Sequence, residues 1–173
     1  QVETNEPKVL IAPYDAKNIY MIQYYNENIG WNPEHAAIIE LFNNYFGGGM
    51  SGIVFQELRE ARGLAYSAFA SYDEAWRKTA KEQFYTYIIT QNDKMIDCVK
   101  EFNTLLDSMP QREATFANSK QYVMKNIASR RVQKFSILSN YHWAQRMGLD
   151  YDINSRIYKE IPGITLQQLA KFA

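Results

Sequence analysis

The sequence predicts an α+β domain in which an antiparallel sheet of four or more strands carries helices packed on it. Runs rich in Ile, Val, Tyr and Phe read as strands and come in two pairs, at 8–12 with 18–26 and at 64–72 with 81–91. Helical sequence follows each pair, so strands and helices do not alternate singly as they do around a parallel sheet. The 173 residues, 46% of them hydrophobic, are enough for one domain with a single core.

The first strand pair is divided by the turn sequence Pro13-Tyr14-Asp15-Ala16. In the second run, NIYMIQYYN, apolar or aromatic side chains occupy both sets of alternating positions. Strands of this kind are typically buried on both faces of a sheet. We therefore expect residues 18–26 to be covered on both sides.

Two short helices are predicted between the strand pairs. Asn32 followed by Pro33 is a favourable start for the first, and the glycines at 47–49 end it, because glycine accepts the left-handed conformation common after a helix. The second helix, GIVFQELREAR, ends at Gly63 in the same way.

The second half of the chain is predicted to be helical, with helices near 93–109, 112–131, 135–147 and 153–161. Thr165 and Gln168 form a capping box at the start of one more helix, which has barely begun at Ala173. A well-capped helix without continuation predicts that the sequence is a piece cut from a longer polypeptide.

Composition excludes several classes of partner. Nineteen basic residues balance nineteen acidic ones, so we expect neither nucleic acid nor a membrane as a partner, and the basic run at 129–134 is interpreted as a solvated face. Cys98 is the single cysteine, which precludes an internal disulfide, and its place in a helical pattern predicts a buried thiol. Bacterial periplasm or cytoplasm is the expected compartment.

Gly47, Gly49 and Gly52 spell G-x-G-x-x-G, the letters of a dinucleotide-binding loop. Such a loop needs a strand before its glycines, so that the following helix points its N-terminus at the pyrophosphate. Here a helix precedes them, and no lysine stands in P-loop position. The glycines are therefore predicted to form the corner between two helices.

Candidate metal ligands are few. The sequence has two histidines, His35 and His142, and in WNPEH a tryptophan, Trp31, stands where an inverted zinc motif would have its first histidine. One imidazole does not hold a zinc ion. His35 is instead expected as a polar surface group on the first turn of its helix.

The segment FGGGMSGIVFQELREARGLAYSAFASY, residues 46–72, closely resembles the pitrilysin/insulinase family of zinc peptidases, which includes mitochondrial processing peptidase. The resemblance implies a domain of the metallohydrolase-like α+β fold, paired with a homologous zinc-bearing half on the same polypeptide or on a separate subunit. This chain lacks the zinc motif, so the resemblance identifies residues 1–173 as a single inactive, C-terminal-type domain, truncated before its final strand. It implies no cofactor on this chain, zinc in the partner domain, and no activity of the chain alone.

By the same resemblance, Arg59 and Tyr66 are the expected site residues. They would reach across to the zinc half and stabilise a peptide substrate as its carbonyl oxygen becomes negative, with one such donor worth on the order of 3–4 kcal/mol. Two alternatives remain open from the residues. Arg59 could be a surface residue beside Glu57 or Glu60, with Tyr66 an ordinary cross-strand aromatic. The whole domain could also be an inert structural paralogue that scaffolds a larger assembly.

Overall fold

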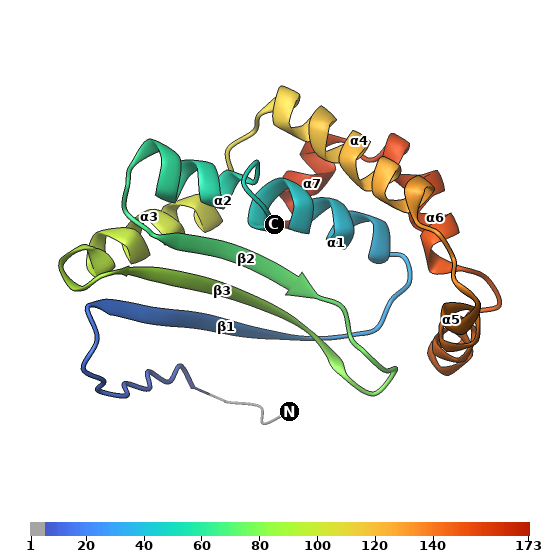
Figure 1. Ribbon diagram of the computed structural model, residues 1–173, viewed down its shortest axis with the longest axis horizontal. Helices are drawn as coiled ribbons and strands as arrows, with labels where there is room; N and C mark the ends of the chain where they lie inside the picture. The colour runs from blue at the N-terminus through green and yellow to red at the C-terminus, as the bar shows by residue number, and fades with distance from the viewer. Residues whose placement is uncertain (1–5) are drawn as a thin grey trace.

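A computed structural model of the protein describes residues 6–173, so the first five residues of the expected domain lie outside the described part. Most of its helices lie on one face of a three-stranded antiparallel sheet (Figure 1), which confirms the α+β class. The strands are β1 (Asn18–Gly30), β2 (Ser67–Asp73) and β3 (Lys81–Gln91). The helices are α1 (Ala36–Phe42), α2 (Ile53–Phe55), α3 (Met95–Asp107), α4 (Glu113–Ser129), α5 (Lys134–Met147), α6 (Ile153–Glu160) and α7 (Leu166–Phe172). Four shorter turns continue or join them: η1 (Asn43–Gly47), η2 (Gln56–Ala61), η3 (Asn92–Lys94) and η4 (Ile161–Gly163).

The sheet has the order β1-β3-β2, and β3 pairs antiparallel with both neighbours. The strands expected at 18–26, 64–72 and 81–91 are present, but the strand expected at 8–12 is not. Val9, Leu10 and Ile11 are exposed and run beside the sheet without joining it (Figure 1). The described residues therefore form three strands, not four, because local β propensity produces a strand only where a neighbour pairs with its backbone.

Within residues 6–173, one face of the sheet is covered and the other is open. Ala68 and Ala70 of β2, with Phe84 and Ile88 of β3, are buried against the helices. On the opposite face Tyr20, Ile22 and Tyr24 of β1 are exposed. The expectation that residues 18–26 are covered on both sides is thus wrong for the described chain, because the helices that pack on the sheet all lie on the same side of it (Figure 1).

The glycine corner lies against the sheet. A Cβ on Gly47 would stand 1.8 Å from the carbonyl oxygen of Ala70, and one on Gly52 would stand 2.6 Å from the carbonyl oxygen of Gly48. Gly49 has a positive φ of 68°. These glycines bring the end of η1 into contact with β2 and turn the chain into α2, as expected for a corner between helices.

The C-terminal helices complete the core. Phe172 of α7 packs on the rings of Phe42 and Tyr72, with ring centroids 5.7 and 5.2 Å away. The capping box of Thr165 and Gln168 is present, as the sequence predicts, and Gly148 after α5 has a left-handed conformation (φ 74°). Among the described residues, no helix combines the length and apolar character that a bilayer span requires.

Candidate functional site

Arg59 is positioned by the helical segment that follows the glycine corner. In α2 and η2, Ile53, Val54 and Leu58 are completely buried, and this orients the segment on the sheet. Phe55 and Arg59 lie one turn apart on a neighbouring, more exposed side. The Arg59 guanidinium lies 4.8 Å from the centre of the Phe55 ring, a cation–π contact that holds the side chain over the helix.

A tight turn reverses the chain after η2. Gly63 has a φ of 58°, a left-handed conformation that favours glycine. The amides of Leu64 and Ala65 both donate to the carbonyl oxygen of Leu58, at 2.8 and 3.2 Å. They give a hydrogen-bond partner to a carbonyl group in the last turn of the helix. Thr90 of β3 donates its hydroxyl to the carbonyl oxygen of Leu64 and ties the turn to the sheet.

Tyr66 comes directly before β2 and is held by its backbone. Its amide donates to the carbonyl oxygen of Ile89 at 2.8 Å, which fixes it to β3. Its side chain is 73% exposed, and its ring centre lies 5.9 Å from the Arg59 guanidinium carbon. The seven-residue spacing thus brings the two expected site residues together on one solvent-facing corner.

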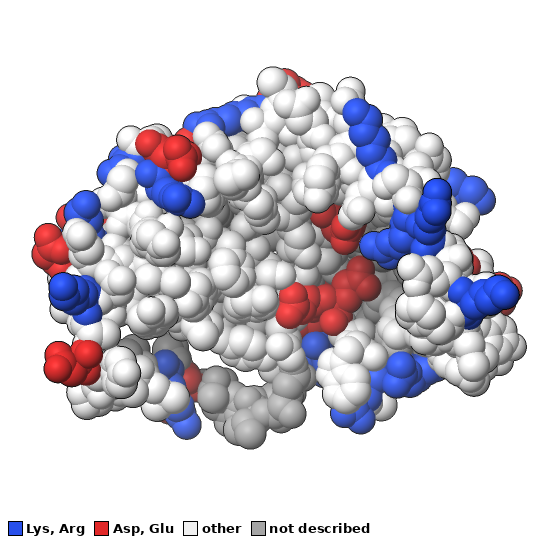
Figure 2. Space-filling view, in the orientation of Figure 1, with Lys and Arg blue, Asp and Glu red and all other residues white. Residues whose placement is uncertain are grey.

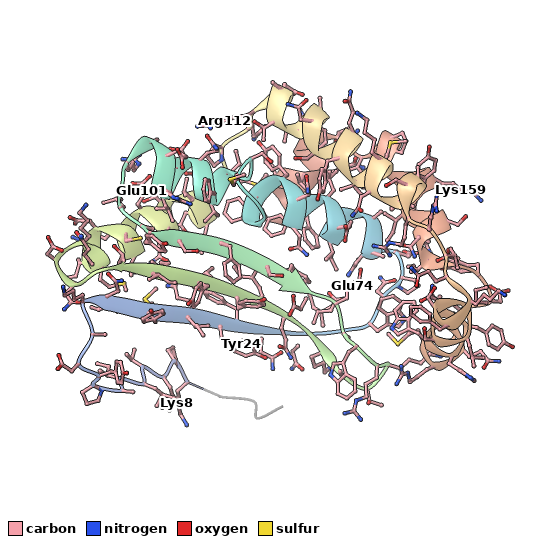
Figure 3. The ribbon with its side chains drawn as sticks, viewed as in Figure 1. Lys8, Tyr24, Glu74, Glu101, Arg112 and Lys159 are labelled. Atoms are coloured by element: carbon pink, nitrogen blue, oxygen red, sulfur yellow. The ribbon has the colours of Figure 1, made fainter. Side chains whose placement is uncertain are left out.

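The other charges of the ELREAR segment are engaged elsewhere in the domain. Glu57 forms an ion pair with Arg112, which precedes α4, and Arg62 with Glu101 of α3 at 2.8 Å. Figure 3 shows Arg112 and Glu101 on either side of this segment. Arg59 has a looser neighbour, the Glu60 carboxylate 3.8 Å from its Nε, with both side chains about half exposed. Its guanidinium therefore keeps donors available to a ligand.

A hollow of about 860 Å³ lies between the glycine corner and α4, lined by Asn43, Met50, Arg112 and Tyr122 among others, and neither Arg59 nor Tyr66 borders it. Within residues 6–173, moreover, no three His, Cys, Asp or Glu side chains are placed to hold a metal ion. The described residues therefore do not fit a zinc ion.

The His35 side chain is less exposed than the surface position that the sequence predicts. It directly precedes α1, is about one-third exposed, and its Nδ1 lies 3.5 Å from Oε2 of Glu82. Glu82 is completely buried, accepts a hydrogen bond from the Tyr72 hydroxyl at 3.1 Å, and leaves its Oε1 without a partner in the described structure. No local pattern predicts this contact, because Glu82 is 47 positions from His35 and β3 becomes a neighbour of α1 only in the fold.

The same region contains a perturbed carboxyl. Burial, together with the nearby carboxylates of Glu82 and Glu40, raises the pKa of Glu74 to about 7. Figure 3 shows Glu74 between α1 and the sheet, and Figure 2 shows acidic side chains gathered in a hollow there. This cluster lies away from Arg59 and Tyr66, and Glu40 is exposed within it.

The site can therefore supply hydrogen-bond donors to a negatively charged or carbonyl oxygen, a guanidinium from Arg59 and a phenol from Tyr66. Phe55 was not singled out from the sequence, although its i, i+4 relation to Arg59 was the pattern that could have identified it. The ion pair of Glu57 with Arg112 joins residues 55 positions apart, and no local pattern predicts it.

Comparison with known proteins gives one family match. The model of the peptidase M16 inactive domain matches residues 1–121. A Mycobacterium tuberculosis protein described as an uncharacterized zinc protease is 34% identical over 68 residues, which are 39% of this chain and 15% of that protein. A Mycobacterium leprae protein of the same description is 45% identical over 40 residues, 23% of this chain and 9% of that protein.

Solved structures share the fold at low identity. A peptidase M16 inactive domain from Pseudomonas fluorescens has a TM-score of 0.74 at 16% identity, over 92% of this chain and 38% of that one. An inactive peptidase domain from Bordetella parapertussis has a TM-score of 0.68 at 10% identity, over 94% and 87% of the two chains. A chain of complex III2 from Candida albicans has a TM-score of 0.61 at 14% identity, over 91% and 40%. The matched part thus spans only a fraction of the curated relatives and of two of these three structures.

Proposed function

Because the chain belongs to the peptidase M16 inactive-domain family of zinc proteases, we propose that it is the non-catalytic, substrate-binding half of a zinc metalloendopeptidase. In this proposal residues 1–173 form one domain, which completes the active site of a homologous zinc-bearing domain. The substrates are peptides bound in extended form. This chain carries no cofactor of its own, and zinc belongs to the partner.

The proposed chemistry uses two donors. When a peptide carbonyl is attacked, negative charge develops on its oxygen, and the zinc half supplies the activated water. The Tyr66 hydroxyl donates to that oxygen, and the Arg59 guanidinium donates to neighbouring carbonyl groups of the substrate backbone. Both interactions strengthen as charge develops, so their loss lowers turnover more than it lowers substrate affinity.

One observation carries the proposal. Of the four charged side chains in the ELREAR segment, Glu57 and Arg62 pair with distant parts of the domain, whereas Arg59 is held beside the exposed Tyr66 with only Glu60 nearby. A purely structural arginine has no need for this arrangement. The exposed ring of Tyr66 likewise adds nothing to the core.

The competing function is that of an inert scaffold. Its support is the fold shared with a chain of complex III2 from Candida albicans, at 14% identity. A scaffold requires neither the guanidinium of Arg59 nor the hydroxyl of Tyr66. The two functions are therefore separated by conservative substitutions at these positions.

The test compares two arginines that stack on aromatic rings. Arg59 lies over Phe55, and Arg77 lies 3.6 Å from the ring of Trp76. In the native product with its zinc half, Arg59→Lys should lower peptide turnover at least tenfold, because lysine keeps the charge but loses the planar fork of donors. Arg77→Lys should leave it unchanged. Equal activities of the two variants would favour the scaffold.

A further inference from the structure

Phe55 supplies the closer of the two rings that the Arg59 guanidinium contacts. It stands four residues before Arg59, at the end of α2, and Arg59 follows in η2. Side chains on a helix point back towards its N-terminus, so the long Arg59 side chain reaches the Phe55 ring. The guanidinium carbon lies 4.8 Å from the centre of this ring and 5.9 Å from that of Tyr66. Phe55 is therefore the main cation–π partner of Arg59.

The Phe55 ring is better anchored than the side chain above it. Phe55 is half-buried, and Val54 and Leu58 on the same segment are completely buried. The side chain of Arg59 is 45% exposed and has four rotatable bonds before its planar group, so in water it samples many rotamers. The contact with Phe55 favours those rotamers that keep the guanidinium over the ring, and the fold fixes where the ring lies.

A ring and a carboxylate hold a guanidinium in different ways. A carboxylate occupies its N–H donors, whereas an aromatic ring attracts the positive charge and leaves the donors free for another acceptor. The carboxylates near Arg59 compete only weakly for it. Glu60 approaches its Nε to 3.8 Å, with both side chains about half exposed, and Glu57 is paired with Arg112. The Phe55 contact can thus orient Arg59 and keep it ready to donate.

We propose that Phe55 is a positioning residue for peptide hydrolysis: its ring holds the Arg59 guanidinium where the carbonyl groups of the substrate meet it. This inference rests on the proposed function, because the position of Arg59 matters to turnover only if Arg59 binds substrate. Phe55 acts through Arg59 and not on the reacting atoms. Its contribution is to restrict Arg59 before the substrate arrives, so that less ordering remains to be done during the reaction.

Fluorination of the ring tests this role with little change in its shape. Phe55→4-fluorophenylalanine, Phe55→3,5-difluorophenylalanine and Phe55→3,4,5-trifluorophenylalanine withdraw electrons stepwise from the ring face and weaken its attraction for a cation. In the native product with its zinc half, kcat should fall with each added fluorine, by about two- to fivefold for the trifluoro ring, while KM changes less. Phe116 of α4 is the matched control, because the Lys120 Nζ lies 4.9 Å from its ring centre. The same three substitutions at Phe116 should leave kcat unchanged.

The same series in an Arg59→Met background separates positioning from packing and from direct contact of the ring with substrate. Methionine removes the cation, so kcat should no longer depend on the number of fluorines. Two results would overturn the inference: a kcat that ignores fluorination in the chain with Arg59, or one that falls equally in the Arg59→Met background.

Peptide turnover of the Arg59→Lys variant distinguishes failure of this inference from failure of the proposed function. Low turnover of Arg59→Lys together with a flat fluorine series would leave the proposed function standing and remove the role of Phe55. Unchanged turnover of Arg59→Lys would remove the proposed function, and the role of Phe55 with it.

Discussion

The carboxyl of Glu74 should make the stability of the domain depend on pH, and Glu74→Gln isolates that dependence. Burial and the carboxylates of Glu82 and Glu40 raise its pKa from 4.5 to about 7 in the folded chain. The folded state therefore holds a proton that the unfolded chain releases near pH 4.5. The contribution of the Glu74 carboxyl to the free energy of unfolding is fully present below pH 4.5 and is lost as the pH rises through about 7.

The size of the effect follows from the two pKa values. The difference between 4.5 and about 7 corresponds to a loss of about 3 kcal/mol between acidic and mildly basic pH. Glutamine keeps the shape and polarity of the protonated carboxyl but does not ionise. Glu74→Gln should thus unfold at nearly the same urea concentration as the unmodified chain at pH 4.5, and be more stable by about 3 kcal/mol at pH 8.

Urea unfolding followed by circular dichroism at pH 4.5, 6 and 8 measures both quantities. Glu34→Gln is the control, because Glu34 is 74% exposed at the same end of the molecule and should not change the pH dependence. A Glu74→Gln chain whose stability changes with pH as much as that of the unmodified chain would refute the assignment.

Three further outcomes follow from the packing. Gly47→Ala should destabilise the fold by more than about 3 kcal/mol in thermal unfolding, because its Cβ would stand 1.8 Å from the Ala70 carbonyl oxygen; a Tm within about 2 °C of the original would contradict the close approach. Phe172→Ala should cost about 2–4 kcal/mol by removing a ring packed on Phe42 and Tyr72, measured by urea unfolding, and a negligible cost would mean that α7 does not close the core. The Cys98 thiol, buried and with a pKa raised to about 11, should react with a thiol reagent at pH 8 at least tenfold more slowly in the folded chain than in urea; equal rates would show that it is accessible.

The sequence predicted elements where local chemistry decides the conformation. The glycines at 47–49 and Gly63 end helices as expected, and the capping box of Thr165 and Gln168 begins α7. The Arg59–Tyr66 pair was singled out by the family resemblance, and in the structure a helix, one tight turn and the start of a strand bring the two side chains together. The role of that pair stays a prediction.

The features that the local sequence did not predict are those that depend on residues distant in the chain. The run at 8–12 has the composition of a strand, yet no strand pairs with it in the described chain. The aromatic face of β1 suggested cover on both sides, but the covering layer would have to come from outside the helices seen here. Glu82 meets His35 and Tyr72 only after β3 has packed beneath α1, so its burial is a tertiary property.

The most direct test of the account is the hydroxyl of Tyr66. In the native product with its zinc half, Tyr66→Phe removes one oxygen from an exposed ring, and Tyr122→Phe makes the same change on the exposed face of α4. With zinc content and fold unchanged in both, the account predicts that kcat falls at least tenfold for Tyr66→Phe and stays within twofold for Tyr122→Phe. An unchanged kcat in the Tyr66→Phe enzyme would contradict the claim that this chain completes the active site.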